Sequence, residues 1–341
     1  MDAPSVTDIC QTSLARDEVQ ATVDNYTAQY DRSRGGSTER RKQSYATLVN
    51  NFYDLVTDFY EFGWGQSFHF APRFRGEAFA ASIARYEHFL ALRLGLRPGM
   101  RVADFGCGVG GPMRSIARFS GATIVGLNNN DYQIARARKH NEAARLSHLC
   151  ELLKCDFLSV PVPDGTFDAA YAIEATCHAP DKRQIYGEVF RVLKPGAHFA
   201  AYEWCVTDRY DSQNPRHREI RQGIEEGNAL PELATVPEVL EALRAVGFEV
   251  LESEDRALTA DPETPWYLPL AAPWYTPSGF RSSPVGRWLT HQMVRSLEAV
   301  GVAPKGATAV SSFLQRGAGY LVEGGRTGIF TPMFYFLVRK P

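Results

Sequence analysis

The sequence predicts an α/β protein with a parallel, doubly wound sheet, and three features of the chain lead to that prediction. Strand-like apolar runs alternate with helical patterns over residues 101–204. A glycine-rich turn joins the first of these runs to a helix. The chain has 341 residues, of which 44% are apolar, so it is long enough to bury a large core.

Helices are expected before the sheet begins. The N-terminal segment is polar up to about Tyr45, and residues 48–60 then show the apolar spacing of a helix. A second helix is expected over residues 79–94, and a third, residues 112–118, follows the glycine turn. Buried parallel strands are expected over residues 101–105, 122–127, 150–154, 168–173 and 197–204, with two further strands over 248–253 and 333–339.

A long segment, residues 257–331, separates the last two predicted strands. It is expected to contain a helix over residues 285–300, in which Val285, Trp288, Leu289, Met293 and Leu297 share one face. The segment is rich in aromatic rings, which suit either a bilayer interface or the mouth of a lipid cavity. A packed subdomain without lipid contact is the alternative. The rings belong to Trp266, Tyr267, Trp274, Tyr275, Phe280 and Trp288.

The charge balance gives no reason to expect a nucleic-acid partner, because 37 Lys and Arg face 39 Asp and Glu without a long basic block. The six cysteines have neither metal-site nor disulfide-framework spacing, which fits a reducing compartment and predicts no bound metal. The first thirty residues are polar, and no window of eighteen apolar residues occurs. We therefore expect a cytoplasmic protein without a signal peptide or transmembrane helix, with peripheral contact to the endoplasmic reticulum membrane as its membrane association.

The glycine turn reads Gly106-Cys-Gly-Val-Gly-Gly111, and two cofactor classes use such a loop. Its spacing matches the dinucleotide fingerprint, but the second strand ends in Asn128-Asn-Asn130, which offers no carboxylate to the ribose of NAD. Asp104 stands before the glycines instead, where a carboxylate suits a ligand that carries an ammonium group. S-adenosylmethionine is therefore favoured over NAD, and a tight turn without a ligand is the remaining alternative.

Several further motifs follow one another along the chain. Together with the glycine turn they resemble the sterol C24-methyltransferases, which are class I S-adenosylmethionine-dependent enzymes, and the resemblance runs from about Tyr45 to the end of the chain. It implies a Rossmann-like, seven-stranded class I methyltransferase sheet with an N-terminal helical arm and a C-terminal insertion. The motifs are Tyr60-Glu-Phe-Gly-Trp-Gly65, Ile173-Glu-Ala-Thr-Cys-His-Ala-Pro180, Tyr202-Glu-Trp204, Pro265-Trp-Tyr-Leu-Pro269 and Gly328-Ile-Phe-Thr-Pro332.

The resemblance implies methyl transfer to C24 of a sterol side chain, followed by a hydride shift and loss of a proton. Water would destroy the carbocation, so its site should be lined by aromatic faces, each of which stabilises a cation by roughly 0.5–2 kcal/mol. Ordinary core packing is the alternative for any one ring. The candidate rings are Tyr60, Phe62, Trp64, Phe68, Phe70, Tyr202 and Trp204.

The resemblance also implies a set of cofactor contacts. Gly106, Gly108 and Gly110 would line the methionine end, and Asp104 would orient its amino group. Asn128 stands where many class I methyltransferases have a ribose-binding acid, so Asn129 or Gln133 could share that contact. The remaining candidates are Asp156 near the adenine amine, with a turn cap as the alternative, Phe157 against the adenine ring, and Tyr53 and Ser67 near the carboxylate end.

Deprotonation requires a base, and a carboxylate in a dry pocket would also stabilise the cation. Glu174 is the favoured group, because it lies just beyond the fourth strand, at the sheet edge where open sheets bind ligands. Glu174 and His178 would share a face if this segment were helical. The other candidates are Tyr60, Glu61, His69 and Glu203, with an ion pair as the structural alternative for Glu203.

The predicted organisation has three parts. Residues 1–90 form a helical arm with the aromatic substrate segment, residues 91–256 the S-adenosylmethionine-binding core, and residues 257–341 the sterol-specific region with the last strand. The expected partners are a sterol substrate and a second copy of the chain. A methyltransferase for another isoprenoid, such as squalene, and a catalytically dead lipid-binding relative are the alternative functions.

Overall fold

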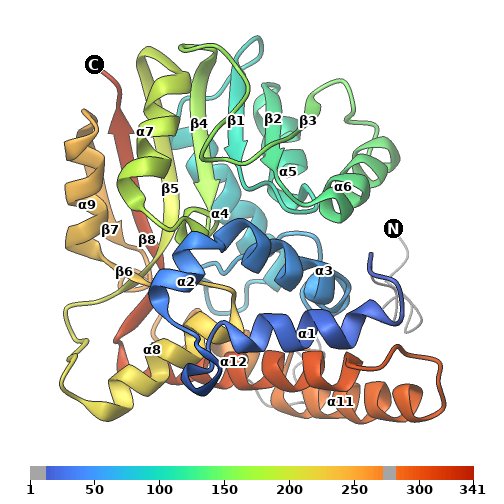
Figure 1. The fold of residues 1–341 in the computed structure, drawn as a ribbon. Coiled ribbons are helices and arrows are strands. Elements are labelled where there is room, and N and C mark those ends of the chain that lie inside the picture. The colour runs from blue at the N-terminus through green and yellow to red at the C-terminus, as the bar shows by residue number, and fades with distance from the viewer. Residues whose placement is uncertain (1–12, 272–281) are drawn as a thin grey trace. The chain divides into compact units, whose positions relative to one another are not determined.

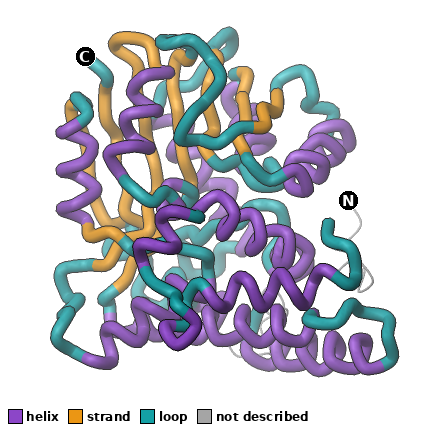
Figure 2. The backbone as a smooth tube through the Cα atoms, viewed as in Figure 1, coloured by secondary structure: helices purple, strands orange, loops and turns teal. Residues whose placement is uncertain are grey.

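The computed structural model describes residues 13–271 and 282–341. It divides into two compact units. The sheet unit comprises residues 67–208, 233–266 and 331–341, and the helical unit comprises the described residues up to 66 together with 209–232 and 267–330. Figure 2 shows that the strands gather in the first unit, whereas the second consists of helices and their connections.

The sheet follows the order β3-β2-β1-β4-β5-β8-β7, with the short β6 paired to β5 outside this path. Seven strands therefore lie side by side along this path, as predicted. The pairs from β3 to β5 are parallel, as expected for strands connected by crossover helices. The strands are β1 (Arg101–Phe105), β2 (Thr123–Asn128), β3 (Cys150–Lys154), β4 (Phe167–Ile173), β5 (Leu193–Val206), β6 (Ala234–Thr235), β7 (Glu249–Asp255) and β8 (Phe330–Arg339).

The last strand corrects the expectation of a wholly parallel sheet. β8 runs antiparallel to β7, and the register pairs Val250 with Val338 and Ser253 with Phe336. Parallel neighbours need a crossover connection, whereas antiparallel neighbours do not. The apolar pattern of a strand does not show its direction, so the sequence alone did not reveal this pairing. β8 is buried along nearly its whole length, which is why the C-terminal segment is so apolar.

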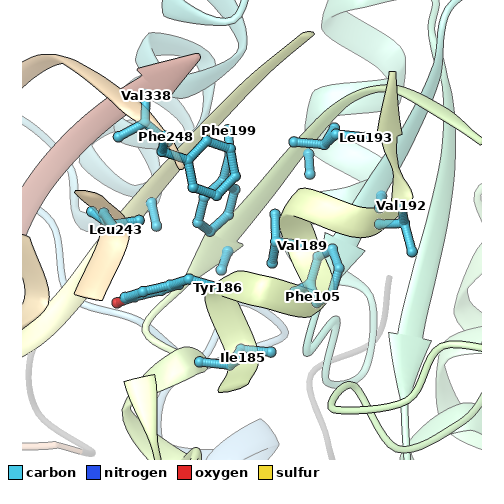
Figure 3. Close-up of a cluster of buried hydrophobic side chains, with 14 of the residues drawn as sticks. Phe105, Ile185, Tyr186, Val189, Val192, Leu193, Phe199, Leu243, Phe248 and Val338 are labelled. Carbon is cyan, nitrogen blue, oxygen red and sulfur yellow. The ribbon is translucent and has the colours of Figure 1, made fainter. Parts of the chain in front are cut away.

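Helices cover the sheet on both faces. α7 and α9 pack on one face, and Figure 3 shows Tyr186 and Val189 of α7 beside Phe199 and Phe248, in a buried hydrophobic cluster that also includes Ile185. α4 and α5 pack together over the sheet near β2 and β5, and α6 contacts β2 and β3. The bounds are α4 (Phe79–Arg93), α5 (Gly111–Ser120), α6 (Asp131–Ala143), α7 (Lys182–Val192) and α9 (Val236–Ala245).

The helical unit has its own core. α3 buries Leu48, Phe52, Leu55 and Val56, a helical stripe that packs against α1 and α12. α1, α12 and α11 run side by side in Figure 1. The helices are α1 (Glu18–Ala28), α2 (Thr38–Gln43), α3 (Tyr45–Gly63), α8 (Pro215–Gly227), α10 (Leu268–Ala271), α11 (Pro284–Ala299) and α12 (Ala307–Thr327), with short 3-10 turns at Arg32–Arg34 here and at Thr176–His178 in the sheet unit.

Two features of the helical unit differ from the sequence prediction. The helical arm was predicted without the bounds of α1 and α2, and no helix was predicted at α8, α10 or α12; the glycines of α12 interrupt its apolar pattern. α11 is where a helix was predicted, but Trp288 is 55% exposed and Leu289 44% exposed, so much of the expected apolar face is not buried. Trp274, Tyr275 and Phe280 of the same segment lie outside the described residues.

The glycines of α12 have a packing role. α8 and α12 approach so closely that a Cβ on Gly317 would lie 2.9 Å from the Cα of Gly227. A Cβ on Gly319, two residues later on the exposed side of the same helix, would meet nothing within 4 Å. α12 thus carries glycine at Gly317 because only hydrogen fits between the two backbones.

Gly317→Ala is expected to lower the free energy of unfolding by about 1–3 kcal/mol, because two backbones would have to separate. Gly319→Ala is the matched control and is expected to raise it by about 0.5–1 kcal/mol through helix propensity. Urea unfolding followed by circular dichroism measures both. Equal effects of the two substitutions would contradict the close packing of α8 and α12.

Candidate active site

The glycine turn lies between β1 and α5 and packs against the segment that follows β4. Gly106 has φ +86°, and a Cβ there would lie only 2.5 Å from the Cβ of Ala175. Gly108 has φ +53°, and a Cβ there would lie 3.9 Å from the Phe68 ring. Both positions have the left-handed backbone that favours glycine, and Gly106 in addition has no room for a side chain. The turn is thus in contact with Phe68 and with Ala175, the residue after Glu174.

Asp104 is the last acidic residue before this turn. It is buried, and its Oδ2 has no hydrogen-bond partner among residues 13–271 and 282–341. Burial raises the pKa of this carboxyl to about 7, although the nearby Tyr171 hydroxyl opposes the shift. An unsatisfied buried carboxylate fits a cationic ligand group, since such a group would supply both the hydrogen bond and the opposite charge. The ammonium end of S-adenosylmethionine meets that requirement.

Asn128 is the last residue of β2, and Asn129 follows it outside the strand. The surroundings of the two side chains differ. Asn128 is buried, and its side-chain amide donates to the Gly108 carbonyl at 3.3 Å and to Gln133 Oε1 at 2.9 Å. Its oxygen accepts from the Asn130 backbone N–H. Asn128 thus braces the glycine turn. Asn129 is partly exposed at the same strand end, so its side chain is the more accessible of the two.

Asp156 and Phe157 follow β3. One carboxylate oxygen of Asp156 accepts from the Leu158 backbone N–H at 2.9 Å, and the Ser159 N–H donates to the Asp156 carbonyl. The turn-capping role considered from the sequence is therefore present. Phe157 is half-buried and packs against the apolar core of the sheet unit.

Glu174 follows β4 directly and carries the most distinctive contacts of the region. It has φ +52°, a conformation that non-glycine residues rarely adopt. Its Oε1 accepts from the Phe70 backbone N–H and its Oε2 from the Trp204 indole N–H, each at 2.8 Å. The carboxyl is 7% exposed, and burial raises its pKa to about 8 even though His69 and the two N–H donors oppose the shift.

The condition under which Glu174 and His178 would share a face, a helical segment, is not met. The left-handed backbone at Glu174 ends the strand, and only a 3-10 turn, Thr176–His178, follows it. The two side chains are therefore not one helical turn apart. His178 is buried in this turn, with its backbone N–H bonded to the Ala175 carbonyl.

Glu203 is fully buried on β5 and has a complete set of partners. Its Oε2 accepts from the hydroxyls of Thr176 and Tyr186 and lies 3.4 Å from Lys182 Nζ. Its Oε1 accepts from the Trp204 backbone N–H. The ion pair considered from the sequence is present, with a lysine rather than an arginine. Because side chains alternate along a strand, Glu203 faces away from its neighbours Tyr202 and Trp204.

His69 and Ser67 meet at Glu87, a residue that no sequence motif indicated. Ser67 Oγ donates to Glu87 Oε1 at 2.7 Å, and His69 Nε2 lies 3.1 Å from the same oxygen. His69 Nδ1 lies 2.7 Å from the Phe70 carbonyl oxygen. Glu87 is buried on α4, a helix that the apolar spacing predicted without distinguishing its polar residues.

The two residues that donate to the Glu174 carboxylate are aromatic, and they have further aromatic neighbours. Phe70 lies 6.2 Å from Trp204 and 4.8 Å from Trp266 between ring centroids, and Phe70 meets Trp266 edge to face. Tyr202 is stacked on Tyr86 at 3.7 Å. Trp266 comes from the Pro265-Trp-Tyr-Leu-Pro269 motif, one of those that resemble the sterol C24-methyltransferases, and its ring was considered for a bilayer interface, a lipid cavity or a packed subdomain. It is the aromatic neighbour that sequence reasoning did not place beside Phe70.

The remaining candidates belong to the helical unit. Tyr53, Tyr60, Glu61 and Phe62 lie on α3, and Trp64 caps its C-terminus. Phe52 meets both Tyr53 and Tyr60 edge to face, at 5.2 and 6.1 Å. Glu61 is buried. Tyr60, Glu61, Phe62 and Trp64 thus lie together at the C-terminal end of α3.

The described part of the chain holds no cluster of three or more His, Cys, Asp or Glu side chains arranged for a metal ion. None of the helices described here combines the length and apolarity needed to cross a bilayer.

Comparisons with solved structures agree with the fold. The [4+2]-cyclase SpnF is 24% identical, with a TM-score of 0.63 over 86% of this chain and 95% of that one. The cyclopropane synthase MmaA2 from Mycobacterium tuberculosis is 16% identical, with a TM-score of 0.63 over 88% and 98%. At these identities the likeness establishes the class I methyltransferase fold.

Comparisons of sequence reach further. Residues 103–201 match the family described as Methyltransferase domain, and residues 278–341 match Sterol methyltransferase C-terminal. Cycloartenol-C-24-methyltransferase 1 of Oryza sativa subsp. japonica is 52% identical over 96% of this chain and 94% of its own length. Sterol 24-C-methyltransferase ERG6 of Saccharomyces cerevisiae is 46% identical over 96% and 87%. The chain is therefore a member of the sterol 24-C-methyltransferase family, whose cofactor is S-adenosylmethionine.

Proposed function

We propose that this S-adenosylmethionine-dependent enzyme methylates C24 of a Δ24 sterol of the cycloartenol, lanosterol or zymosterol type, and that Glu174 accepts the proton released afterwards. The observation that carries the role of Glu174 is its buried carboxylate, held by two N–H donors among aromatic rings. The sequence relationship favours a sterol over squalene, because the similarity to cycloartenol enzymes spans nearly the whole chain. The cofactor supplies an electrophilic methyl group when bound.

Glu174 has the chemistry that deprotonation requires. Methylation at C24 and the hydride shift leave a cation on the sterol side chain. One carboxylate oxygen takes a proton from the new methyl carbon, and the electrons of the broken C–H bond form the C24=C28 double bond. Each oxygen of Glu174 uses one lone pair on an N–H donor, so each retains a lone pair that can accept.

The same carboxylate favours formation of the cation. A negative charge in a water-poor site stabilises developing positive charge more than it would in water. The Phe70 and Trp204 rings add their electron-rich faces, and Trp266 closes the apolar surroundings of Phe70. Glu203 does not suit this role, because Lys182 and two hydroxyls already occupy its carboxylate.

The cofactor contacts that we propose are Asp104, the glycine turn and Asn129. Asp104 would bind the ammonium group, and the turn of Gly106, Gly108 and Gly110 would let the ligand approach the backbone. Asn129 is the better candidate for the ribose hydroxyls, because the polar atoms of Asn128 are occupied within the protein. We also retain the division into residues 1–90, 91–256 and 257–341 as a functional one.

We further propose peripheral contact with a membrane through α11 and the loop after it. The exposed large apolar side chains here are Val285, Trp288, Leu289, Val300 and Val302, which are half of those that the structure describes. Arg295 and Lys305 are exposed beside them, so the surface suits a bilayer with anionic headgroups. The substrate is itself a membrane lipid, so docking would bring the enzyme to it. Self-association through the same face is the competing arrangement.

Glu174→Gln is expected to lower kcat by roughly a hundredfold, within the range of general-base catalysis, because an amide cannot accept the proton. Affinity for S-adenosylhomocysteine should change by less than about threefold. A radiolabelled methyl assay with cycloartenol, lanosterol, zymosterol and squalene measures turnover, and calorimetry measures affinity.

The glutamine side chain would place its NH2 against one of the two N–H donors, so Glu174→Asp is the second variant. It keeps the charge but retracts it, and we expect partial activity. Wild-type turnover in both variants would exclude Glu174 as the base, and an equal loss of cofactor affinity would make its role structural. Methylation of squalene alone would overturn the sterol assignment.

The affinity for S-adenosylhomocysteine is expected to rise with pH through about 7 and then level off. Asp104 is protonated below its pKa of about 7, and only the ionised carboxylate attracts the ligand ammonium group. Asp104→Asn should weaken binding by about 10- to 100-fold and remove the pH dependence. Asp168→Asn is the control that should keep both the affinity and its pH dependence. Asp168 lies near the beginning of β4, at the other end of that strand from Glu174. Calorimetry between pH 5.5 and 8.5 tests this, and an unchanged pH profile in Asp104→Asn would refute it.

Substituting both Trp288 and Leu289 by Asp is expected to lower partitioning onto sterol-containing vesicles with anionic lipid by roughly tenfold. Leu258→Asp is the matched control, because Leu258 is 76% exposed in the sheet unit. Co-sedimentation measures partitioning, and activity on detergent-dispersed sterol should not change. A wild-type dimer that dissociates in the double variant, with vesicle binding retained, would favour self-association instead.

A further inference from the structure

Glu87 lies at a junction of hydrogen bonds that the proposed reaction does not use. It is 1% exposed on α4 and accepts from Ser67 and His69. We propose that Glu87 is a positioning residue: it holds His69 as an imidazolium, and through His69 it fixes Phe70 and Glu174. The inference deepens the proposed function and rests on the assigned role of Glu174.

The acceptors around His69 determine its protonation. Nδ1 lies 2.7 Å from the Phe70 carbonyl oxygen, which can only accept, so Nδ1 carries a proton. Nε2 lies 3.1 Å from Glu87 Oε1, and this oxygen already accepts from Ser67. An ionised Glu87 therefore requires a proton on Nε2 as well. Both ring nitrogens donate, and the ring has no lone pair left to take a proton from the substrate.

The electrostatic surroundings agree with this arrangement. Burial disfavours a charge on His69, yet the hydrogen bond and charge of Glu87 raise the pKa of the imidazole above its usual range. Burial also disfavours the charge of Glu87, but the hydrogen bonds from His69, Ser115 and Ser67 lower the pKa of its carboxyl. The other carboxyl groups that act on this pair are Glu174 after β4 and Asp104 on β1. The pair thus fits an imidazolium beside a carboxylate.

The network continues from His69 to the proposed base. The Phe70 carbonyl accepts from His69, and the Phe70 N–H donates to Glu174 Oε1. Phe70 is therefore held on both sides of its α-carbon, which fixes its ring and one oxygen of Glu174. Trp204 holds the other oxygen. Glu87 is the far end of this line, so its influence reaches Glu174 through a single backbone residue.

Glu87 also balances charge. A lone imidazolium near the site would repel the sulfonium of the cofactor and the cation of the sterol. The Glu87 carboxylate cancels that charge within hydrogen-bond distance. Glu174 is then left as the negative charge that can act on a cation.

Ring nitrogen NMR of 15N-histidine-labelled, full-length protein bound to S-adenosylhomocysteine tests the proposal. At pH 8 an ordinary histidine, with a pKa of about 6.5, is neutral. We expect one ring with both nitrogens protonated, absent from His69→Gln and converted to a neutral ring in Glu87→Gln. A His69 ring with one unprotonated nitrogen in the wild type would overturn the proposal. This measurement needs no turnover, so its outcome is independent of whether Glu174 is the base.

Kinetics of the same variants test the positioning role. Glu87→Gln should lower kcat at least tenfold while the KM for S-adenosylmethionine changes by less than about threefold, and Glu87→Asp should restore part of the loss. Glu188→Gln is the control, because Glu188 is a half-buried carboxylate on α7 that pairs with Arg191. Should Glu87→Gln fail to fold, Glu87→Asp and the wild-type spectrum decide the question. Full turnover in Glu87→Gln would refute the positioning role.

Discussion

The site depends on a carboxylate that is buried before its cation arrives. Glu174 lies among Phe70, Trp204 and other apolar groups, and burial raises its pKa to about 8. A buried charge without partners would cost several kcal/mol, so the protein supplies two N–H donors at 2.8 Å. These donors hold the carboxylate but do not neutralise it. With this pKa the carboxyl is largely protonated at neutral pH, and a positive charge placed beside it would favour its ionised form.

Asp104 repeats this arrangement at the cofactor turn. Its Oδ2 is buried without a partner in the described chain, and its pKa is raised to about 7. The two carboxyls are linked mechanically, because Gly106 packs against Ala175, the residue after Glu174. A side chain at Gly106 would push these segments apart. The strict glycine requirement thus serves the spacing between two acidic groups as well as the approach of a ligand.

Sequence patterns predicted the regular parts of the fold well. β1 and β3 have the predicted bounds, and α4 differs by one residue at its end. Apolar periodicity carries this information, since it reports which residues are buried locally. It could not reveal α12, whose glycines fit against Gly227 of α8, because that contact joins segments far apart in the chain. The antiparallel direction of β8 was hidden for the same reason.

The candidate site divides along the same line. Glu174 and Asp104 were found because each stands beside a strand end or a glycine turn, which are local signals. Glu87 was missed because a glutamate in a helix has no special local pattern, and only the folded chain brings it to His69. A shared face of Glu174 and His178 was conditional on a helix, and their four-residue spacing could not show that the backbone is left-handed at Glu174.

The aromatic residues and the acid at this site are connected by hydrogen bonds. The Trp204 ring neighbours Phe70, and its indole N–H donates to Glu174. The position of the ring therefore depends on the charge of the carboxylate. A protonated Glu174 is a weaker acceptor, and the indole is then held less firmly. A cation in the pocket favours the ionised form, which strengthens the hydrogen bonds to both Trp204 and Phe70.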